Sequence, residues 1–521
     1  MATKLLTGLV SPKTDIRISL DSKRKVYSTL DRIQGSVTFT PSADLPFDDI
    51  DIEFVGTSRT YVERLSTAAA ISGRSQAFHQ FLRLSQPGVA EHYPGDRILK
   101  AGQSYKISFV FAVPRQLLPR VCTHTILNDA IREAHLQLPP SLGDCEASNK
   151  SEQLDDFAPD MASIRYGVYA KISTVKPGQS QRTTIVAKAR KVRIIPAVDE
   201  LPPVNVEGNS DITMRKEKKL RKGLLKGKLG TLVMEAAQPA SFKLPAPDAE
   251  SGDRITTMAT VLLRFDPQES NAQPPKLNNL TSKLKVTTFF STAARRDFPN
   301  RTDCLNELSN GFHSETLEVS SRCMANVEWT KMDAERDVSP DPWALPRRTS
   351  SAVSAPLLPP DASSSYTGGA FYIARLLVPI ELPSNKCFVP TFHSCLVSRV
   401  YTLGLSLSTN TAFGGNMDLR VPVQISALPS LRNDSPRPSI TSLNSVEIDD
   451  ESADGVDEFF EPRTIYAPED EYLGSSRLQG GAVEPQASRR DSVMHDQGNG
   501  LPEYSLLAPG SRGRRPGVPV F

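Results

Sequence analysis

The feature that most constrains the fold of this chain is the alternation of apolar and polar residues at every second position. In RIQGSVTF, residues 32–39, the side chains of Ile33, Val37 and Phe39 share one face, while polar residues occupy the other. Successive side chains of a β-strand point to opposite faces, so this pattern predicts a strand with one buried face. The same pattern recurs in IDIEF (50–54), KISFVFAV (106–113), SIRYGVYAKI (163–172) and YTLGLSL (401–407).

The strand-like segments form two blocks, residues 1–196 and 214–430, and clusters of Pro, Gly and Asn separate the segments within each block. Many short strands broken by such turn residues favour β-sandwich domains. We therefore predict an all-β chain with two tandem immunoglobulin-type β-sandwiches.

Composition marks the boundaries of these blocks. IIPAVDELPPV, residues 194–204, is rich in proline and predicts an interdomain linker over 197–213. A polar stretch at about 333–369 interrupts the second block and is typical of a disordered insertion. Residues 431–521 are rich in Ser, Pro, Gly, Asp and Glu, and such a composition predicts a disordered tail.

One short helix is expected inside the first block. NDAIREAHL begins at Asn128, a residue type that favours the N-cap, and it places Ile131, Ala134 and His135 at helical spacing. The helix must end before Pro139 because a proline in its interior would break it.

Charge and cysteine content exclude several classes of protein. The formal net charge of +2 gives no overall attraction to nucleic acid. The six cysteines form no C-x-x-C pair, which favours a reducing compartment over a disulfide-rich secreted framework. The first apolar run is interrupted by Pro12 and is too short for a secretory signal peptide. No run of 18 apolar residues occurs, so we expect no transmembrane helix.

No motif of a known enzyme class is present. The sequence has no G-x-G-x-x-G, G-x-x-x-x-G-K-[ST], H-E-x-x-H or G-x-S-x-G, so we expect neither catalysis nor a cofactor. Cys122 and His124 are close in sequence, yet a structural zinc site needs about four ligands. We therefore predict no metal site and interpret both as ordinary core or surface residues.

A basic run, residues 214–228, carries eight positive charges against Glu217. It is either a patch that attracts anionic lipid or an acidic partner, or a solvated linker and strand edge on which lysines prevent aggregation. The second interpretation is favoured. The candidate basic-patch or ubiquitin-acceptor residues are Lys216, Lys218, Lys219, Lys222, Lys226 and Lys228.

Two R-R-x-S sequences end at Ser350 and Ser492, both in predicted disorder. Basophilic kinases recognise such sequences, so both serines are candidate phosphosites. A phosphate there would recruit an arginine-rich reader such as a 14-3-3 protein.

The predicted tail contains LPEY, formed by Leu501, Pro502, Glu503 and Tyr504. Pro502 favours the polyproline II conformation and lowers the entropic cost of ordering, and Tyr504 offers a large flat contact. The motif therefore suits an aromatic groove that reads extended, proline-containing peptides.

The strand series resembles the arrestin family, specifically the α-arrestins of the fungal trafficking-adaptor type. The resemblance covers roughly residues 15–430. The segments that carry it in the first block are 26–41, 50–63, 99–119, 135–144, 164–172 and 189–196, and those in the second are 220–239, 389–408 and 419–425.

The resemblance implies two arrestin-like sandwiches, no enzymatic activity and an adaptor role. Members of the family recruit WW-domain ubiquitin ligases of the HECT class to the cytosolic segments of membrane transporters or receptors, through L/P-P-x-Y motifs. It also implies a cytoplasmic protein that associates only peripherally with the plasma membrane and endosomes. This chain departs from the family in having a single motif, with Leu501 at its first position. An arrestin-fold signalling scaffold, or a retromer-like coat subunit without ligase recruitment, is the alternative.

Overall fold

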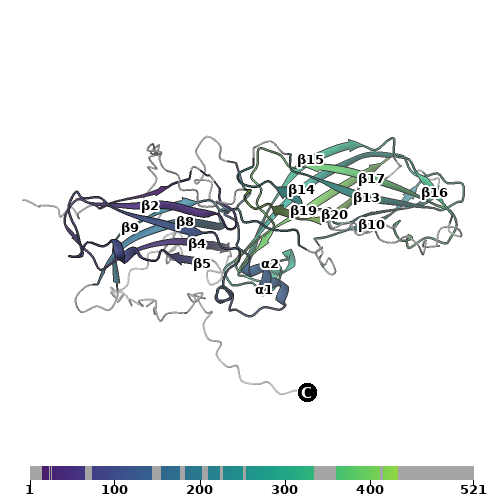
Figure 1. Cartoon of the computed structure of the whole chain (residues 1–521). Helices are drawn as coiled ribbons and strands as arrows, with labels where there is room; N and C mark the ends of the chain where they lie inside the picture. Colours follow the sequence, from purple (N-terminus) through teal and green to yellow (C-terminus); the bar gives the residue numbers. More distant parts are fainter. Residues whose placement is uncertain are drawn as a thin grey trace, which may run out of the picture.

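The structure of the chain is a computed structural model. It describes residues 14–431 except 23, 25, 65–72, 144–153, 176–181, 202–208, 210, 223–226, 250–253, 334–358 and 411–414. The described residues form two elongated lobes of β-strands that meet end to end (Figure 1).

The first lobe contains two main antiparallel sheets. One has the strand order β1-β2-β7, and the other has the order β5-β4-β8-β9. The short strands β3 and β6 pair beside them. The bounds are β1 (Thr14–Leu20), β2 (Arg32–Pro41), β3 (Leu45–Pro46), β4 (Asp49–Arg64), β5 (Gly73–Ser85), β6 (Ile98–Leu99), β7 (Tyr105–Ala112), β8 (Ala162–Val175) and β9 (Arg182–Val192).

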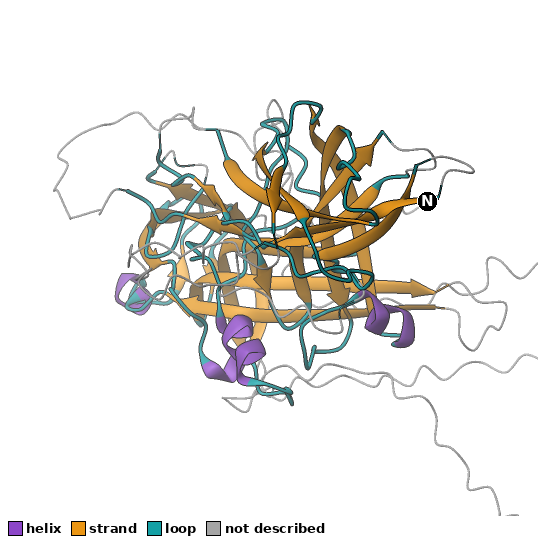
Figure 2. Ribbon diagram, turned by 90° about the vertical axis from the view of Figure 1, so that its right-hand side faces the viewer, coloured by secondary structure: helices purple, strands orange, loops and turns teal. Residues whose placement is uncertain are grey.

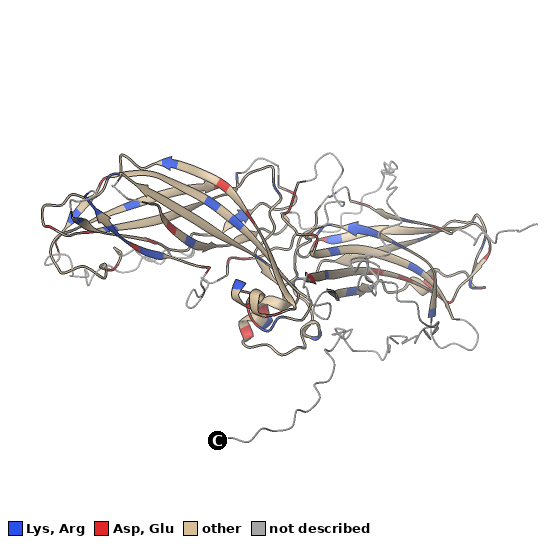
Figure 3. Cartoon of the chain, turned by 180° about the vertical axis from the view of Figure 1, so that it is seen from behind, with Lys and Arg blue, Asp and Glu red and all other residues tan. Residues whose placement is uncertain are grey.

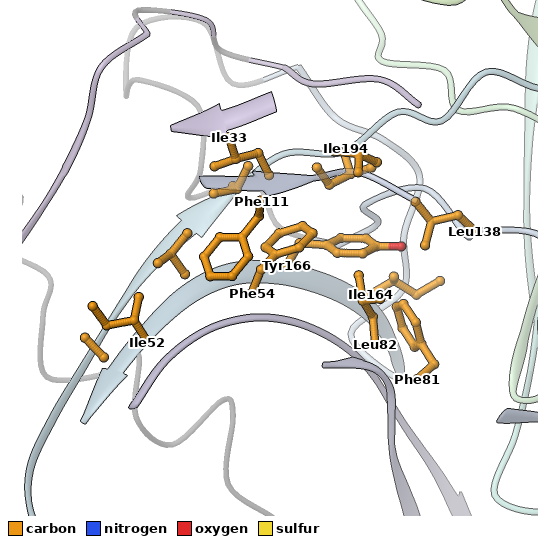
Figure 4. Packing of buried hydrophobic residues seen from close by; sticks show 14 of the residues in the cluster. Ile33, Ile52, Phe54, Phe81, Leu82, Phe111, Leu138, Ile164, Tyr166 and Ile194 are labelled. Carbon is orange, nitrogen blue, oxygen red and sulfur yellow. The ribbon is translucent and has the colours of Figure 1, made fainter. Parts of the chain in front are cut away.

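The apolar faces of these two sheets pack against each other and form the core of the lobe. Phe54 on β4 lies 6.0 Å, between ring centroids, from both Phe111 on β7 and Tyr166 on β8 (Figure 4). The hydroxyl of Tyr166 donates a hydrogen bond of 2.5 Å to the main-chain oxygen of Pro139. Burial without this bond would be costly, so the bond lets a tyrosine occupy the core.

The second lobe is a sandwich of two five-stranded sheets with a parallel pair, β12-β21, beside them. One sheet has the order β10-β11-β13-β17-β16; the other is β15-β14-β19-β18, with β20 also paired to β19. The bounds are β10 (Arg215–Arg221), β11 (Lys228–Ala236), β12 (Phe242–Leu244), β13 (Thr256–Pro267), β14 (Leu277–Ser291), β15 (Asn310–Cys323), β16 (Thr330–Met332), β17 (Phe371–Glu381), β18 (Phe392–His393), β19 (Val397–Thr409), β20 (Met417–Val423) and β21 (Ile425–Ala427).

Helical segments are few among the described residues, and they lie outside the strands along one side of the molecule (Figure 2). They are η1 (Val89–His92), η2 (Pro119–Val121), α1 (Asp129–Leu136) and α2 (Arg301–Asn306). The helix predicted after Asn128 is confirmed as α1, since the Asn128 side chain accepts a hydrogen bond of 2.9 Å from the Ile131 amide. No helix in the described ranges is long and apolar enough to cross a membrane.

The predicted all-β fold with two tandem sandwiches is confirmed for the described part of the chain. Residues within the predicted linker are tied to the second lobe, because Val198 pairs with Ala427 and Thr213 pairs with Arg420. Residues 334–358 of the predicted insertion lie outside the described residues.

Residues 359–369, which we expected to be disordered with the rest of the insertion, instead pack on the second lobe. The Ser363 amide donates a hydrogen bond of 2.7 Å to Asp266, and Arg264 donates one of 3.1 Å to the Pro360 carbonyl. Both bonds use main-chain atoms of the segment and connect it to the buried Arg264–Asp266 ion pair, so its polar composition gives no sign of them. The predicted tail beyond residue 431 lies outside the described residues.

Candidate functional site

The motif residues of the predicted tail and insertion are not among those that the structure describes. Leu501, Pro502, Glu503 and Tyr504 lie outside the described residues, as do the candidate phosphosites Ser350 and Ser492 and the candidate acceptor Lys226. The remaining candidate lysines, Lys216, Lys218, Lys219, Lys222 and Lys228, are described and lie on or beside β10 and β11.

Strand β10 is an edge strand, since it pairs only with β11 in the five-stranded sheet. Leu220 is the buried residue of this strand and anchors it to the core of the second lobe. The exposed positions of β10 carry Lys216, Lys219 and Arg221. Lysine on an exposed edge prevents pairing with another chain, so the position of β10 agrees with the second interpretation of the basic run.

Several charges of the basic run are already engaged. The ammonium of Lys222 lies 2.7 Å from Glu269, that of Lys218 donates to the Gly415 carbonyl, and that of Lys216 is 4.0 Å from Asp418. Burial lowers the pKa of Lys218. Lysine and arginine positions occur along the strands of both lobes (Figure 3). The described residues of the basic run therefore form a strand edge on which several charges are paired.

The junction of the two lobes is built from shared hydrophobic cores. Phe290, Phe392 and Val397 of the second lobe belong to the core cluster of the first. Phe157, which precedes β8, belongs to the core cluster of the second. Between the lobes, the Thr60 hydroxyl donates a hydrogen bond of 2.7 Å to the Ser291 carbonyl. Because apolar contacts cross the junction in both directions, the lobes are held in one arrangement.

A cluster of two cysteines and two histidines lies at this junction, and we call Cys122, His124, His135 and Cys395 the Cys–His cluster. Cys122 follows η2, His124 lies in the loop that leads to α1, and His135 is in the last turn of α1. Cys395 lies in the tight turn between β18 and β19, which closes through a 2.8 Å bond from the Ser394 amide to the Val397 carbonyl.

The side-chain atoms of the Cys–His cluster converge on one point. The Sγ atom of Cys122 lies 3.3 Å from Nε2 of His124 and 3.5 Å from Nδ1 of His135. The Sγ atom of Cys395 lies 3.4 Å from the same Nε2 atom of His124. All four candidate ligand atoms are within 4.8 Å of one another. Three of the four residues are buried, and His124 is partly exposed.

The electrostatics of the cluster distinguish its two thiols. Contact with Cys395 and with both imidazoles holds the pKa of the Cys122 thiol well below its usual range, although burial opposes this shift. Contact with Cys122, together with burial, raises the pKa of Cys395. The Cys122 thiol likewise raises the pKa of His124. Of the two thiols, that of Cys122 is therefore the more readily deprotonated.

Of the four residues of the cluster, only Cys122 and His124 stand close together in the sequence, and they predict no metal site. The fold adds His135, which lies 11 positions after His124, and Cys395, which is 271 positions from His124. Only the C-x-H pair is a local signal, and the usual short ligand spacings of zinc motifs are missing. The helix prediction already placed His135 beside the apolar face of α1, which was the one further signal available.

Residues 87–226 match the family model described as the Bul1 N terminus. The matched segment runs from the loop before η1 to a point between β10 and β11, and it includes three of the four residues of the Cys–His cluster. This match supports an arrestin-related family for the chain. A search of the curated proteins finds no match.

Proposed function

We propose that this protein is an adaptor of the α-arrestin type that links a HECT-class WW-domain ubiquitin ligase to membrane transporters or receptors. The proposed role is non-enzymatic and promotes ubiquitination, endocytosis and sorting of the bound membrane protein. The observation that carries the proposal is the combination of two tandem β-sandwiches, a match to the Bul1 N terminus and one LPEY sequence.

In this proposal the two lobes bind a cytosolic segment of the membrane protein, and the LPEY sequence binds the ligase. Pro502 restricts the backbone and Tyr504 fills an aromatic groove, so most of the binding energy comes from two residues. A single motif gives no avidity from repeats, and the ligase contact is therefore weak unless a second contact supports it.

The first experiment measures binding of the full-length protein to isolated WW domains of a HECT ligase. The test variant is Tyr504→Ala, and the matched control is Tyr472→Ala, another tyrosine of the same acidic tail that follows no L/P-P-x sequence. We expect binding by the wild type and the control and loss of binding by Tyr504→Ala. Equal binding by all three, or by none, would remove the ligase role and favour a signalling scaffold or a retromer-like coat subunit.

We also propose that the adaptor is itself ubiquitinated on the basic run. Lys219 is exposed on the β10 edge and forms no ion pair within the described ranges, whereas Lys222 is paired with Glu269. Mass spectrometry of the protein after reaction with the ligase should therefore find Lys219 modified before Lys222. Unchanged total modification in Lys219→Arg, with a loss in Lys222→Arg, would contradict this order.

The remaining parts of the proposal concern regulation and location. Phosphorylation of Ser350 and Ser492 would create sites for 14-3-3 proteins, and the adaptor would move from the cytoplasm to the plasma membrane and endosomes with its cargo. Capture of phosphorylated protein on 14-3-3, compared with Ser350→Ala, Ser492→Ala and the variant that carries both changes, tests the first point. Undiminished capture of the double variant would contradict it.

A further inference from the structure

The distances within the Cys–His cluster agree with those between the ligands of a tetrahedral zinc ion. With a Zn–S bond of about 2.3 Å and a Zn–N bond of about 2.0 Å, tetrahedral geometry places sulfur and nitrogen ligands about 3.5 Å apart. Three of the four sulfur–nitrogen separations in the cluster are 3.3, 3.5 and 3.4 Å, and the fourth, between Cys395 and His135, is within 4.8 Å. We propose that Cys122, His124, His135 and Cys395 bind one zinc ion that joins the two lobes.

His124 has contacts at both ring nitrogens, and it has the tautomer that a metal ligand needs. The Nδ1 atom of His124 lies 3.2 Å from the Thr125 carbonyl, which accepts a hydrogen bond and therefore fixes the proton on Nδ1. Nε2 then carries the lone pair, and it lies 3.3 Å from Sγ of Cys122 and 3.4 Å from Sγ of Cys395. A hydrogen bond from the second nitrogen to a carbonyl is the usual way in which proteins orient a metal-binding histidine.

His135 presents Nδ1 to the cluster. Its Nε2 atom is buried and has no hydrogen-bond partner among the described residues. A small cavity beside the cluster is lined by His135, Cys395, Ser58 and His79, among others. The side chain is only 1% exposed, so the unpaired Nε2 is costly. A metal ion on Nδ1 would place the imidazole proton on Nε2 and would replace the weak contact of Nδ1 with the Cys122 thiol.

The donor set favours zinc over other common ions. Two thiolates and two imidazoles form a soft to borderline S₂N₂ set, which suits zinc in tetrahedral geometry, whereas magnesium and calcium require oxygen ligands. With all four positions filled by protein, the site would be structural and closed to substrate.

The proposed ion has a clear mechanical consequence. Three ligands lie between residues 122 and 135 of the first lobe, and the fourth lies in the β18–β19 turn of the second. The intervening loop already contacts the second lobe through a 2.9 Å bond from the Leu127 amide to the Arg296 carbonyl. Zinc would hold the loop, α1 and the turn together, so metal binding stabilises the arrangement of the two lobes.

The test measures the metal content of the purified, fully reduced, full-length chain by elemental mass spectrometry. We expect equimolar zinc in the wild type and in Cys323→Ser, a control in which an exposed cysteine outside the cluster is replaced. Cys395→Ser should retain less than about one tenth of this zinc, because a structural site loses most of its affinity for the metal when one thiolate ligand is removed. After replacement of zinc by cobalt, only the wild type and the control should show the visible absorption of tetrahedral thiolate coordination.

Cys395→Ser would also remove a buried group, so a second variant guards against misfolding. His124 is partly exposed, and His124→Ala should fold while its zinc affinity, measured by competition with a chelator, falls at least about 100-fold. Chelation of zinc from the wild type should also increase hydrogen exchange in residues 122–136. Absence of both zinc and cobalt binding in the reduced wild type, or a Cys122–Cys395 disulfide in its place, would overturn the proposal.

Discussion

The guanidinium of Arg399 donates a hydrogen bond of 2.8 Å to the main-chain oxygen of Asp156, a residue 243 positions earlier in the chain. Arg399 lies on β19 of the second lobe and is completely buried. It also donates a hydrogen bond of 2.9 Å to the Thr288 hydroxyl and one of 3.2 Å to the Phe157 carbonyl. One side chain thus connects strands β14 and β19 to the segment that enters β8, and it fixes the contact between the lobes.

Replacement of Arg399 by methionine should destabilise the protein by about 2–4 kcal/mol, because buried oxygens that it now satisfies would lose their donor. The matched control is Arg375→Met, which changes an exposed arginine on β17 and should cost less than about 0.5 kcal/mol. Chemical denaturation of the full-length chain measures both changes. Equal stability of the two variants would contradict the proposed role of Arg399 at the junction.

Removal of the Asp266 carboxylate should release the segment 359–369. Asp266 accepts a hydrogen bond of 2.8 Å from Arg264 and one of 2.7 Å from the Ser363 amide. The ion pair between Arg264 and Asp266 is buried. Asp266→Ala would leave Arg264 buried without this partner, with a loss of about 3–5 kcal/mol. Hydrogen exchange in 359–369 should increase strongly.

The control for this prediction is Glu381→Ala. It removes an exposed ion pair with Arg254, at 3.4 Å, whose contribution is at most about 1 kcal/mol. Exchange in 359–369 should remain that of the wild type. Protection of the segment in Asp266→Ala would show that other contacts hold it.

Gly35 should tolerate no side chain. A Cβ atom built at this position of β2 would lie 2.1 Å from the Ser19 carbonyl and 2.7 Å from Cζ of Phe109. Gly35→Ala must therefore move a strand or a core ring, and we expect a loss of at least about 2 kcal/mol. Gly404→Ala on β19 is the control, because its nearest neighbour would be at 3.6 Å. Thermal unfolding should separate the two variants, and equal midpoints would refute the steric argument.

Tyr93 should contribute to the pH dependence of stability at alkaline pH. Burial, reinforced by the hydrogen bond to Asp49, raises the pKa of Tyr93 from 10.0 to about 12. A raised pKa favours the protonated form in the folded state, so the contribution is complete below pH 10 and is lost as the pH rises towards 12.

The measurement compares unfolding midpoints of the wild type and Tyr93→Phe between pH 8 and pH 12, a window set by this pKa shift. The difference between them should be constant up to about pH 10 and should decrease above it. A difference that stays constant to pH 12 would contradict the shift.

The sequence by itself determined where strands and the helix α1 form. Period-two alternation identified residues 32–39 and 401–407, which lie in β2 and β19, and Asn128 marked the start of α1. These features depend on side-chain direction along one strand and on the hydrogen bonds of one helix end, which involve neighbours only a few positions apart.

Only the tertiary structure decided which distant residues meet. No local sequence signal shows that Cys395 joins the Cys–His cluster. The same holds for the hydrogen bond from Arg399 to Asp156. Both depend on how the two lobes pack, since the β18–β19 turn and β19 belong to the second lobe and meet the first lobe only at the junction. A residue's chemistry is local, but its partners are set by strand pairing and core packing across hundreds of positions.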